Sequence, residues 1–304
     1  MNETRETTVT ETHRLRRSVA AVVLLAALFA LLPALPASAR TLLWKVQGKQ
    51  GTAYLFGSFH AAKEGAYPLP PVVEESFARS RALMVEADLT AVSPEQAVGA
   101  VQQRGMLPEG DTLCNHVSAQ TCRSYNDYLA GRGVIPELFA GFKPWFAATM
   151  IALLEVQQQG YEVGNGVDLY FTRKAKGKKQ IVELESVDYQ FSLLDSFTPR
   201  EQELFLVSTM REGGEKIDAA YRAWRSGDAV ALEEAALGEL KRDRSLEPLF
   251  EKLIFARNRT MAAAIERRMQ GKEPVFVVVG AAHLVGPRGI VELLRRKGYR
   301  VEQQ

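Results

Sequence analysis

The sequence predicts an α/β fold with a mixed sheet core, built from two similar units of strand, helix and strand. Residues 275–279 form a short, wholly apolar run rich in β-branched residues, which is the pattern of a strand buried on both faces. A helical stretch and another extended run follow within residues 287–302. Residues 52–88 repeat this order, and in both units a Gly-x-x-His sequence follows the first strand. This similarity indicates a pseudo-duplicated βαβ core.

The elements before residue 100 can be assigned in chain order. Residues 41–47 and 52–56 are short extended runs around a glycine-flanked loop, which predicts a hairpin. Residues 71–80 have a helical pattern, and residues 82–88 form the next apolar run. Ser93 is followed by proline and, three residues on, by glutamine, which is the signature of a helix start.

The second half is more helical. Residues 143–154 predict an apolar helix entered through a proline, and residues 169–176 predict a short helix before a strand at 181–185. Thr198, followed by proline and then by glutamate, begins another capped helix. From there the pattern is helical to about residue 271.

The chain is predicted to consist of a leader and one domain. Residues 1–39 combine a basic segment, an uninterrupted apolar stretch and a small-x-small sequence, which are typical of a cleaved secretory signal. An uncleaved anchor is the alternative, but the apolar stretch is short for a span of about 20 residues. We therefore expect an exported protein, periplasmic or secreted, with no stable membrane span after cleavage. Residues 40–304 predict a single domain with helical insertions at about 91–160 and 198–271.

Cys114 and Cys122 are eight residues apart with His116 between them. In an exported protein this spacing favours a local disulfide. A Cys/His metal site is the less favoured interpretation, because the Cys-x-x-Cys spacing of structural zinc is missing.

Charge and motifs argue against several functional classes. Lys and Arg number 38 and Asp and Glu 36, and no basic stripe with interleaved aromatic residues occurs, so there is no case for nucleic-acid binding. The sequence also lacks a Gly-x-Ser-x-Gly elbow, a His-Glu-x-x-His helix and a Walker loop. The commonest serine hydrolase, zinc protease and nucleotide hydrolase mechanisms therefore lose support.

Four polar side chains are predicted to lie where strands end. His60 and His283 close the two Gly-x-x-His sequences, and Glu86 and Glu185 lie in the last positions of two apolar runs. Open α/β sheets bind ligands beyond the carboxyl ends of their strands. Either histidine alone is typical of a structural residue; the matched pair favours one shared site. Whether Glu185 belongs to this site, and whether Asp168 does more than cap a helix, the sequence leaves open.

These side chains can support two kinds of chemistry. His60, His283, Glu86 and Glu185 could bind a divalent metal and leave positions open for a water that the metal activates. Without a metal, a histidine oriented by Glu86 could act as a general base.

Several short motifs resemble those of one family and occur in its order. They are residues 55–60, 85–88, 143–145, 166–168, 184–185 with Gln190, 257–258 and 280–284. On these motifs the chain resembles the TraB/GumN (TraB/PrgY/GumN) family over essentially all of residues 40–304. The family is similar to the Tiki proteases, which cleave Wnt proteins with the help of a divalent metal. More distantly it resembles erythromycin esterase-like hydrolases and the haem-binding ChaN proteins, which have a pseudo-duplicated α/β core with helical insertions.

The resemblance implies roles for individual residues. His60 and His283 would be metal ligands or catalytic histidines, and Glu86 a ligand or general base. Arg257 would be a candidate for stabilising an oxyanion. The implied metal is manganese or cobalt, with zinc as a further candidate.

Three functions therefore remain in view. The first is an exported metal-dependent hydrolase, peptidase-like, that uses the paired Gly-x-x-His motifs and a glutamate. The second is a metal-free, esterase-like hydrolase with a His/Glu general base. The third is a non-catalytic protein that binds a peptide, a signal or haem. In each case the expected partner is a peptide or a small molecule.

Overall fold

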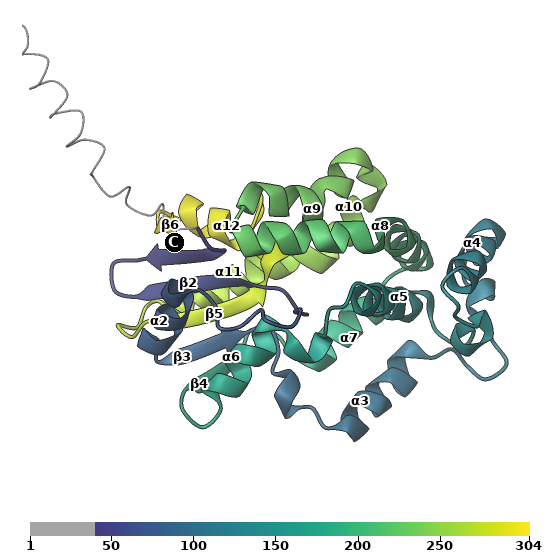
Figure 1. Ribbon diagram of the computed structural model, residues 1–304, viewed down its shortest axis with the longest axis horizontal. Helices are drawn as coiled ribbons and strands as arrows, with labels where there is room; N and C mark the ends of the chain where they lie inside the picture. Colours follow the sequence, from purple (N-terminus) through teal and green to yellow (C-terminus); the bar gives the residue numbers. More distant parts are fainter. Residues whose placement is uncertain (1–39) are drawn as a thin grey trace, which may run out of the picture. The chain divides into compact units, whose positions relative to one another are not determined.

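The computed structural model describes residues 40–304, apart from the side chain of Glu212. The secretory signal predicted for residues 1–39 lies outside the described residues. Within the described chain, six strands form a sheet with the order β4, β3, β5, β2, β1, β6 (Figure 1). The strands are β1 (Leu43–Gln47), β2 (Thr52–Ser58), β3 (Ala82–Val85), β4 (Gln180–Glu183), β5 (Val275–Gly280) and β6 (Arg300–Gln303).

Four neighbouring strands of the sheet are parallel. β2 pairs with β5, β5 with β3, and β3 with β4 in this way, so their carboxyl ends lie along one edge. β1 pairs antiparallel with β2 through the predicted hairpin, and β6 pairs antiparallel with β1. The prediction of an α/β fold with a mixed sheet is therefore confirmed.

The two strand–helix–strand units meet through their first strands. β2 and β5 are neighbours, with Ser58 paired to Gly280, so the two Gly-x-x-His sequences leave the sheet side by side. The closing strands differ, because β3 lies next to β5 whereas β6 lies beyond β1 at the far edge. The similarity of the units thus holds where the histidines are placed, while the strand order is not symmetrical.

The apolar run in β5 forms the centre of the main core. All of its residues are buried, and because side chains alternate between faces, both faces of the sheet are covered there. The helices that share this core are α2 (Pro71–Arg79), α6 (Val167–Ala175), α9 (Ala229–Arg242), α11 (Ala256–Arg268), α12 (Ile290–Arg296) and the end of α8 (Pro199–Ser226).

Further helices lie beyond the carboxyl edge of the sheet and pack on one another in two smaller cores (Figure 1). These include α4 (Ala119–Ala130), α5 (Pro144–Gln158), α7 (Val187–Asp195) and α10 (Glu247–Phe250), whereas α3 (Pro94–Ala100) has no buried residue and belongs to neither core. The capping boxes predicted at Ser93 and Thr198 are both confirmed. α8 is interrupted at Gly213, whose φ of 54° is not helical. Among the described helices, none is long and apolar enough to cross a membrane.

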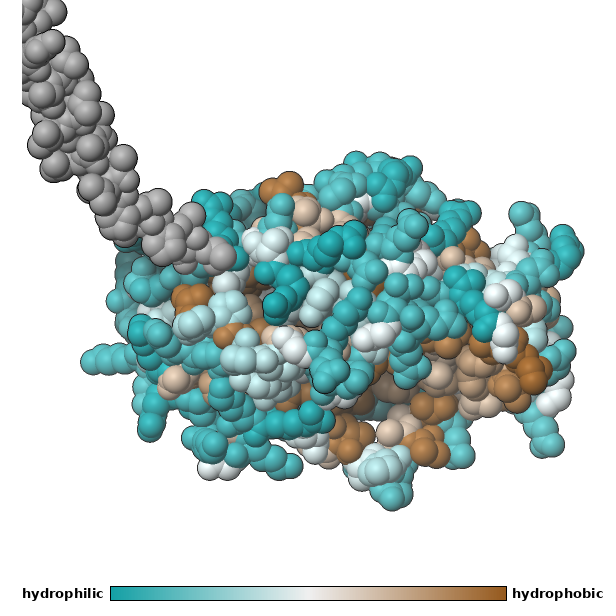
Figure 2. Space-filling model, in the orientation of Figure 1, coloured by the Kyte–Doolittle hydropathy of each residue, from teal (hydrophilic) through white to brown (hydrophobic). Residues whose placement is uncertain are grey.

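Short 3₁₀ and π-helical turns connect these elements. They are η1 (Leu89–Ala91), η2 (Val101–Gly105), η3 (Leu113–Asn115), η4 (Pro136–Phe139), η5 (Val163–Asn165), η6 (Arg244–Leu246), η7 (Glu251–Phe255) and η8 (Ala281–His283). A disulfide between Cys114 and Cys122 ties η3 to α4. In the space-filling view of residues 40–304, apolar side chains gather on the side where α4 and α5 lie, whereas the side formed by the sheet is mainly hydrophilic (Figure 2).

Candidate functional site

The parallel strands deliver the predicted side chains to one edge of the sheet. His60 follows β2, Glu86 follows β3, Glu185 follows β4 and His283 ends η8 after β5. β3 and β4 end at Val85 and at Glu183, earlier than the predicted residues 88 and 185. Backbone pairing nevertheless continues, because the N–H of Glu185 donates to the carbonyl of Glu86 at 2.8 Å. The two glutamates are therefore adjacent.

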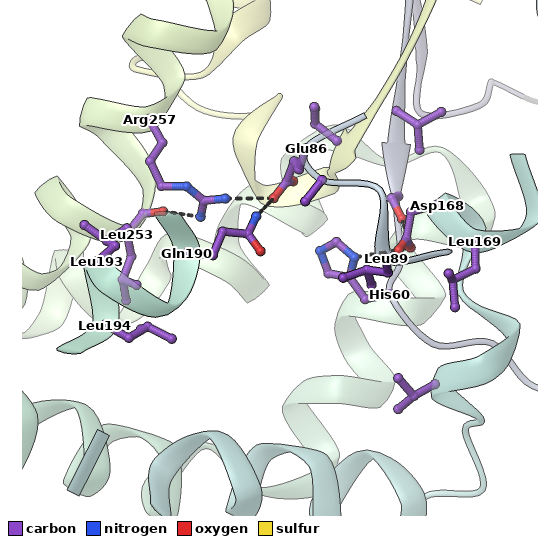
Figure 3. A pocket seen from close by; sticks show the side chains of 15 residues that line it. His60, Glu86, Leu89, Asp168, Leu169, Gln190, Leu193, Leu194, Leu253 and Arg257 are labelled. Atoms are coloured by element: carbon purple, nitrogen blue, oxygen red, sulfur yellow. Dashed lines mark hydrogen bonds and ion pairs between the residues drawn. The ribbon is translucent and has the colours of Figure 1, made fainter. Parts of the chain in front are cut away.

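Arg257 of α11 bonds to both carboxylates, and Figure 3 shows its guanidinium directed at Glu86. Its Nε donates to Oε1 of Glu185 at 2.9 Å and its Nη2 to Oε2 of Glu185 at 2.7 Å. Nη2 also donates to Oε2 of Glu86 at 2.8 Å. The exposed fractions of the three side chains are 10% for Arg257, 12% for Glu86 and 4% for Glu185. One buried guanidinium thus compensates two adjacent negative charges, which would otherwise be costly to bury.

Glu86 is held by partners on several elements. Its Oε1 accepts from the N–H of Gly280 at 2.5 Å, and its Oε2 accepts from Gln190 at 3.4 Å as well as from Arg257. Burial alone would raise the pKa of Glu86, but the neighbouring imidazoles, Arg257 and the Gly280 N–H lower it to about 2. Glu86 is therefore a fixed, ionised carboxylate at neutral pH.

His283 is buried, and a hydrogen bond with Asn258 orients its ring. Nδ1 lies 2.6 Å from Oδ1 of Asn258, whose amide nitrogen donates to the carbonyl of Arg288 at 2.9 Å. This arrangement assigns the proton of the neutral ring to Nδ1 and a lone pair to Nε2. Nε2 lies 3.7 Å from Oε1 of Glu86. Burial lowers the pKa of His283 to about 4 against the pull of Glu86, so the imidazole is neutral at pH 7.

His60 stands at the mouth of the site, with 61% of its side chain exposed. Its Nδ1 lies 3.3 Å from Oδ1 of Asp168, which also accepts from the hydroxyl of Ser58 at 2.9 Å. Desolvation by the surrounding protein would by itself lower the pKa of His60. The hydrogen bond to Asp168 and the negative charges of Asp168 and Glu86 outweigh this effect and raise the pKa to about 9. In a Ser-His-Asp triad the histidine contacts the serine. Here Asp168 contacts both, which does not fit a serine nucleophile.

We expect Asp168→Asn to lower the pKa of His60 in the metal-free protein from about 9 toward its ordinary value of 6.5. The amide has nearly the same shape but no charge with which to stabilise the imidazolium. An NMR titration of the His60 ring measures the change. A titration that stays near 9 in the variant would show that Asp168 is not the group that holds the proton on His60.

The two histidines and Glu86 face a common point. A methyl group on Gly280, in place of its hydrogen, would lie 3.0 Å from Nε2 of His60, 3.2 Å from Oε1 of Glu86 and 3.5 Å from Cδ2 of His283. Glycine therefore leaves open a small space that three side chains with metal-binding atoms surround. Between Nε2 of His283 and the Glu86 carboxylate two acceptors face each other, an arrangement that a cation would stabilise.

These donor atoms suit a divalent ion. Imidazole nitrogen and carboxylate oxygen bind manganese, cobalt and zinc, and in two-His-one-carboxylate sites they leave positions open. Both histidines also have a partner at Nδ1, Asp168 for His60 and Asn258 for His283, as metal-binding histidines usually do. Within residues 40–304, no three His, Cys, Asp or Glu side chains are already spaced as in a formed metal site. Binding would therefore require these side chains to close on the ion.

We expect Gly280→Ala to abolish binding of a divalent ion. Its methyl group would occupy the space between His60 and Glu86, at distances tighter than ordinary van der Waals contact. Isothermal titration of the metal-free variant with Mn²⁺ measures the loss. Its control is Gly99→Ala in α3, because a methyl group at Gly99 would meet no atom within 4 Å. Equal affinities for Mn²⁺ in Gly280→Ala and in the wild type would place any metal elsewhere.

Two hollows meet at this polar centre. The first, of about 350 Å³, extends along Gln190 and Leu193 of α7, and the second, of about 560 Å³, extends along α8 and α9. Figure 3 shows the first hollow, with Gln190 and Arg257 directed at Glu86 and with His60 beside Asp168. The residues that line both hollows are Ser58, His60, Glu86, Val163, Leu253 and Arg257.

The structure also gives positions to residues for which sequence reasoning found no clear role. For Asp168 the sequence left open whether it does more than cap a helix, and Asn258 stood out only as part of a motif. Their contacts depend on helices α6 and α11, which local spacing does not place against the sheet edge. Position 280 carried a signal, because glycine in a Gly-x-x-His sequence after a buried strand indicates a close approach.

The chain matches a known protein family over nearly all of the described residues. The model of the TraB/PrgY/gumN family matches residues 42–303. The chain belongs to the TraB/PrgY/gumN family. The match confirms the family resemblance that was inferred from the short motifs.

The individual proteins that the chain is similar to are distant in sequence. A protein from Escherichia coli named "Uncharacterized protein YbaP" is 23% identical over 80% of this chain and 87% of its own length. An uncharacterized protein of Treponema pallidum is 21% identical over 88% of the chain and 83% of its own length. "Metalloprotease TIKI1" of Danio rerio is 22% identical over 86% of the chain and 62% of its own length. No solved structure matches the chain significantly.

Proposed function

We propose that this family member is an exported, metal-dependent hydrolase that acts on peptides. One observation carries the proposal: two imidazoles and an ionised carboxylate surround one space that only a glycine at position 280 keeps open. The Glu86 carboxylate and the Nε2 lone pair of His283 also face each other at 3.7 Å, so both could coordinate an ion that binds beside them.

Each residue has a distinct part in the proposal. His60, Glu86 and His283 would hold the ion, and Asp168 and Asn258 would keep the Nδ1 protons in place so that the Nε2 atoms face the centre. Manganese or cobalt is favoured and zinc is a further candidate; a bound ion would polarise a carbonyl and lower the pKa of a water. Glu185 contacts Arg257 rather than the central space.

Arg257 bonds to three acceptors around the site. Its guanidinium donates to Glu86, Glu185 and the carbonyl of Leu253. These bonds support a positioning role, in which Arg257 fixes the Glu86 carboxylate toward the centre. The oxyanion role predicted for Arg257 stays a prediction.

Similarity to the Danio rerio metalloprotease supports the reaction class. Export rests on the leader predicted from residues 1–39, and it would place the protein in the periplasm or outside the cell. Peptides would then be accessible substrates.

Turnover of internally quenched peptides tests the proposal. We expect the purified, metal-free protein to be inactive and to gain activity with Mn²⁺, Co²⁺ or Zn²⁺, and to lose it again on chelation. Full activity after exhaustive chelation would instead support the metal-free His/Glu hydrolase. Absence of turnover with all three ions, together with a Soret band on addition of haem, would favour a binding protein.

A further inference from the structure

The polar centre lies between two hollows with different walls. The larger hollow lies between α5, α8, α9 and η7, and its apolar wall includes Ala152, Val156, Ile217, Ala235, Ala236 and Ile254. The smaller hollow extends instead along η1, α6 and α7, where its wall includes Leu89, Leu169, Leu193 and Leu194. A substrate whose reacting bond lies at the centre therefore extends into apolar surroundings in both directions.

The charged residues of the larger hollow have partners of opposite charge in the protein. Glu155 accepts hydrogen bonds from Tyr128 and Arg132, and Lys216 donates to Glu239 at 3.4 Å. Burying a charged substrate group beside these pairs would cost desolvation without a dedicated partner.

In the smaller hollow, the charged side chains are those of the centre itself. Glu86, Asp168, His60 and Arg257 are bonded to one another or to Ser58, Gln190 and Glu185. Apart from the neutral side chains of Ser58 and Gln190, the rest of the wall consists of leucine, valine and alanine residues. Beyond the His60 imidazolium and the other bonded groups of the centre, neither hollow thus presents an uncompensated charge that would recognise a charged side chain of a substrate.

We propose that the substrate is an extended peptide with aliphatic side chains on both sides of the bond that is cleaved. This inference rests on the proposed function. Cleavage adds one water across the amide: the carbonyl carbon gains the hydroxyl, the C–N bond breaks, and the amine nitrogen takes the proton. The aliphatic group on one side fills the larger hollow, and that on the other side fills the smaller one. Hydrophobic burial supplies the affinity.

Binding of short labelled peptides to the metal-free protein tests the inference without turnover. Fluorescence anisotropy is measured for a peptide with leucine on both sides of the central bond, and for siblings with aspartate or alanine on either side. We expect the Leu/Leu peptide to bind most tightly and each aspartate to weaken binding about 10-fold or more. Equal affinities for all the peptides would overturn the inference.

Two phenylalanine substitutions in α9, one inside the larger hollow and one outside it, test the assignment of this hollow. Ala236→Phe is expected to weaken binding of the Leu/Leu peptide about 10- to 100-fold. Whichever Leu/Ala sibling places alanine in the larger hollow should keep its wild-type affinity, which also shows that the variant is folded. Ala231→Phe, on an exposed position of the same helix α9 that does not line the hollow, serves as the control. Unchanged Leu/Leu binding in Ala236→Phe would contradict the assignment of the larger hollow.

The two proposals fail in different ways. Selective Leu/Leu binding without turnover under Mn²⁺, Co²⁺ or Zn²⁺ would contradict the proposed function and leave the peptide site standing. Turnover that is equally fast with aspartate on both sides would contradict the peptide site and leave the metal-dependent reaction standing. Cleavage of a long-chain acyl ester, with no binding of the Leu/Leu peptide, would overturn the assignment of a peptide substrate.

Discussion

His60→Ala is expected to weaken Mn²⁺ binding by about 100-fold or more while leaving the metal-free protein folded. The imidazole supplies one of the three donor groups around the space beside Gly280, and even residues behind the ligands typically change metal affinity 10- to 100-fold. Because 61% of the His60 side chain is exposed, loss of its pair with Asp168 should lower the free energy of unfolding by no more than about 1 kcal/mol. Isothermal titration and urea unfolding measure the two effects.

The matched control is His116→Ala, which removes another histidine of the domain. His116 forms its hydrogen bond with Asp111, at 2.7 Å, in the η3 region rather than at the sheet edge. We expect its removal to leave Mn²⁺ affinity unchanged. Similar losses in both variants would indicate non-specific binding by histidines, and wild-type affinity in His60→Ala would remove His60 from the site.

Arg257→Ala is expected to destabilise the protein by about 3–5 kcal/mol. Its removal leaves Glu86 and Glu185, which are adjacent and almost fully buried, without the cation that compensates them. The loss should be smaller at pH 5 than at pH 8, because Arg257 helps to lower the pKa of Glu86, and without the guanidinium Glu86 takes up a proton more readily as the pH falls. Urea unfolding at the two pH values measures both the size and the direction of this change.

Arg259→Ala provides a control two residues along the same helix. Arg259 is 57% exposed and pairs with the partly exposed Glu251 at 2.6 Å, and surface pairs of this kind contribute about 0–1 kcal/mol. A loss of stability in Arg257→Ala no larger than that in Arg259→Ala would show that the buried carboxylates do not depend on Arg257.

Much of the fold follows from local sequence patterns. The run from Val275 to Val279 can be buried only at the centre of a sheet, and the capping boxes at Ser93 and Thr198 mark helix starts that the structure confirms. Strand order is different, because it depends on which strands pair across long stretches of chain. The sequence units suggested a symmetrical pair, whereas β5 inserts between β2 and β3. Contacts of this kind leave no periodic trace in either strand.

In the candidate site too, local sequence predicted some residues, whereas others depend on long-range packing. Matching Gly-x-x-His sequences after two strands were enough to expect His60 and His283 at one edge, since carboxyl ends of parallel strands meet there. The partners behind them come from α6 and α11, as Asp168 and Asn258, and their positions depend on how those helices pack on the sheet. For Glu185 the sequence left open whether it belongs to the site or to the core, and the structure pairs it with Arg257, which also bonds to Glu86.

Anomalous diffraction from crystals soaked in Mn²⁺ tests the central claim most directly, because it locates the ion without relying on activity. We predict one strong peak in the space beside Gly280, within coordination distance of His60, Glu86 and His283. A peak that contacts none of these three residues, or no peak there at Mn²⁺ concentrations that restore turnover, would contradict the account.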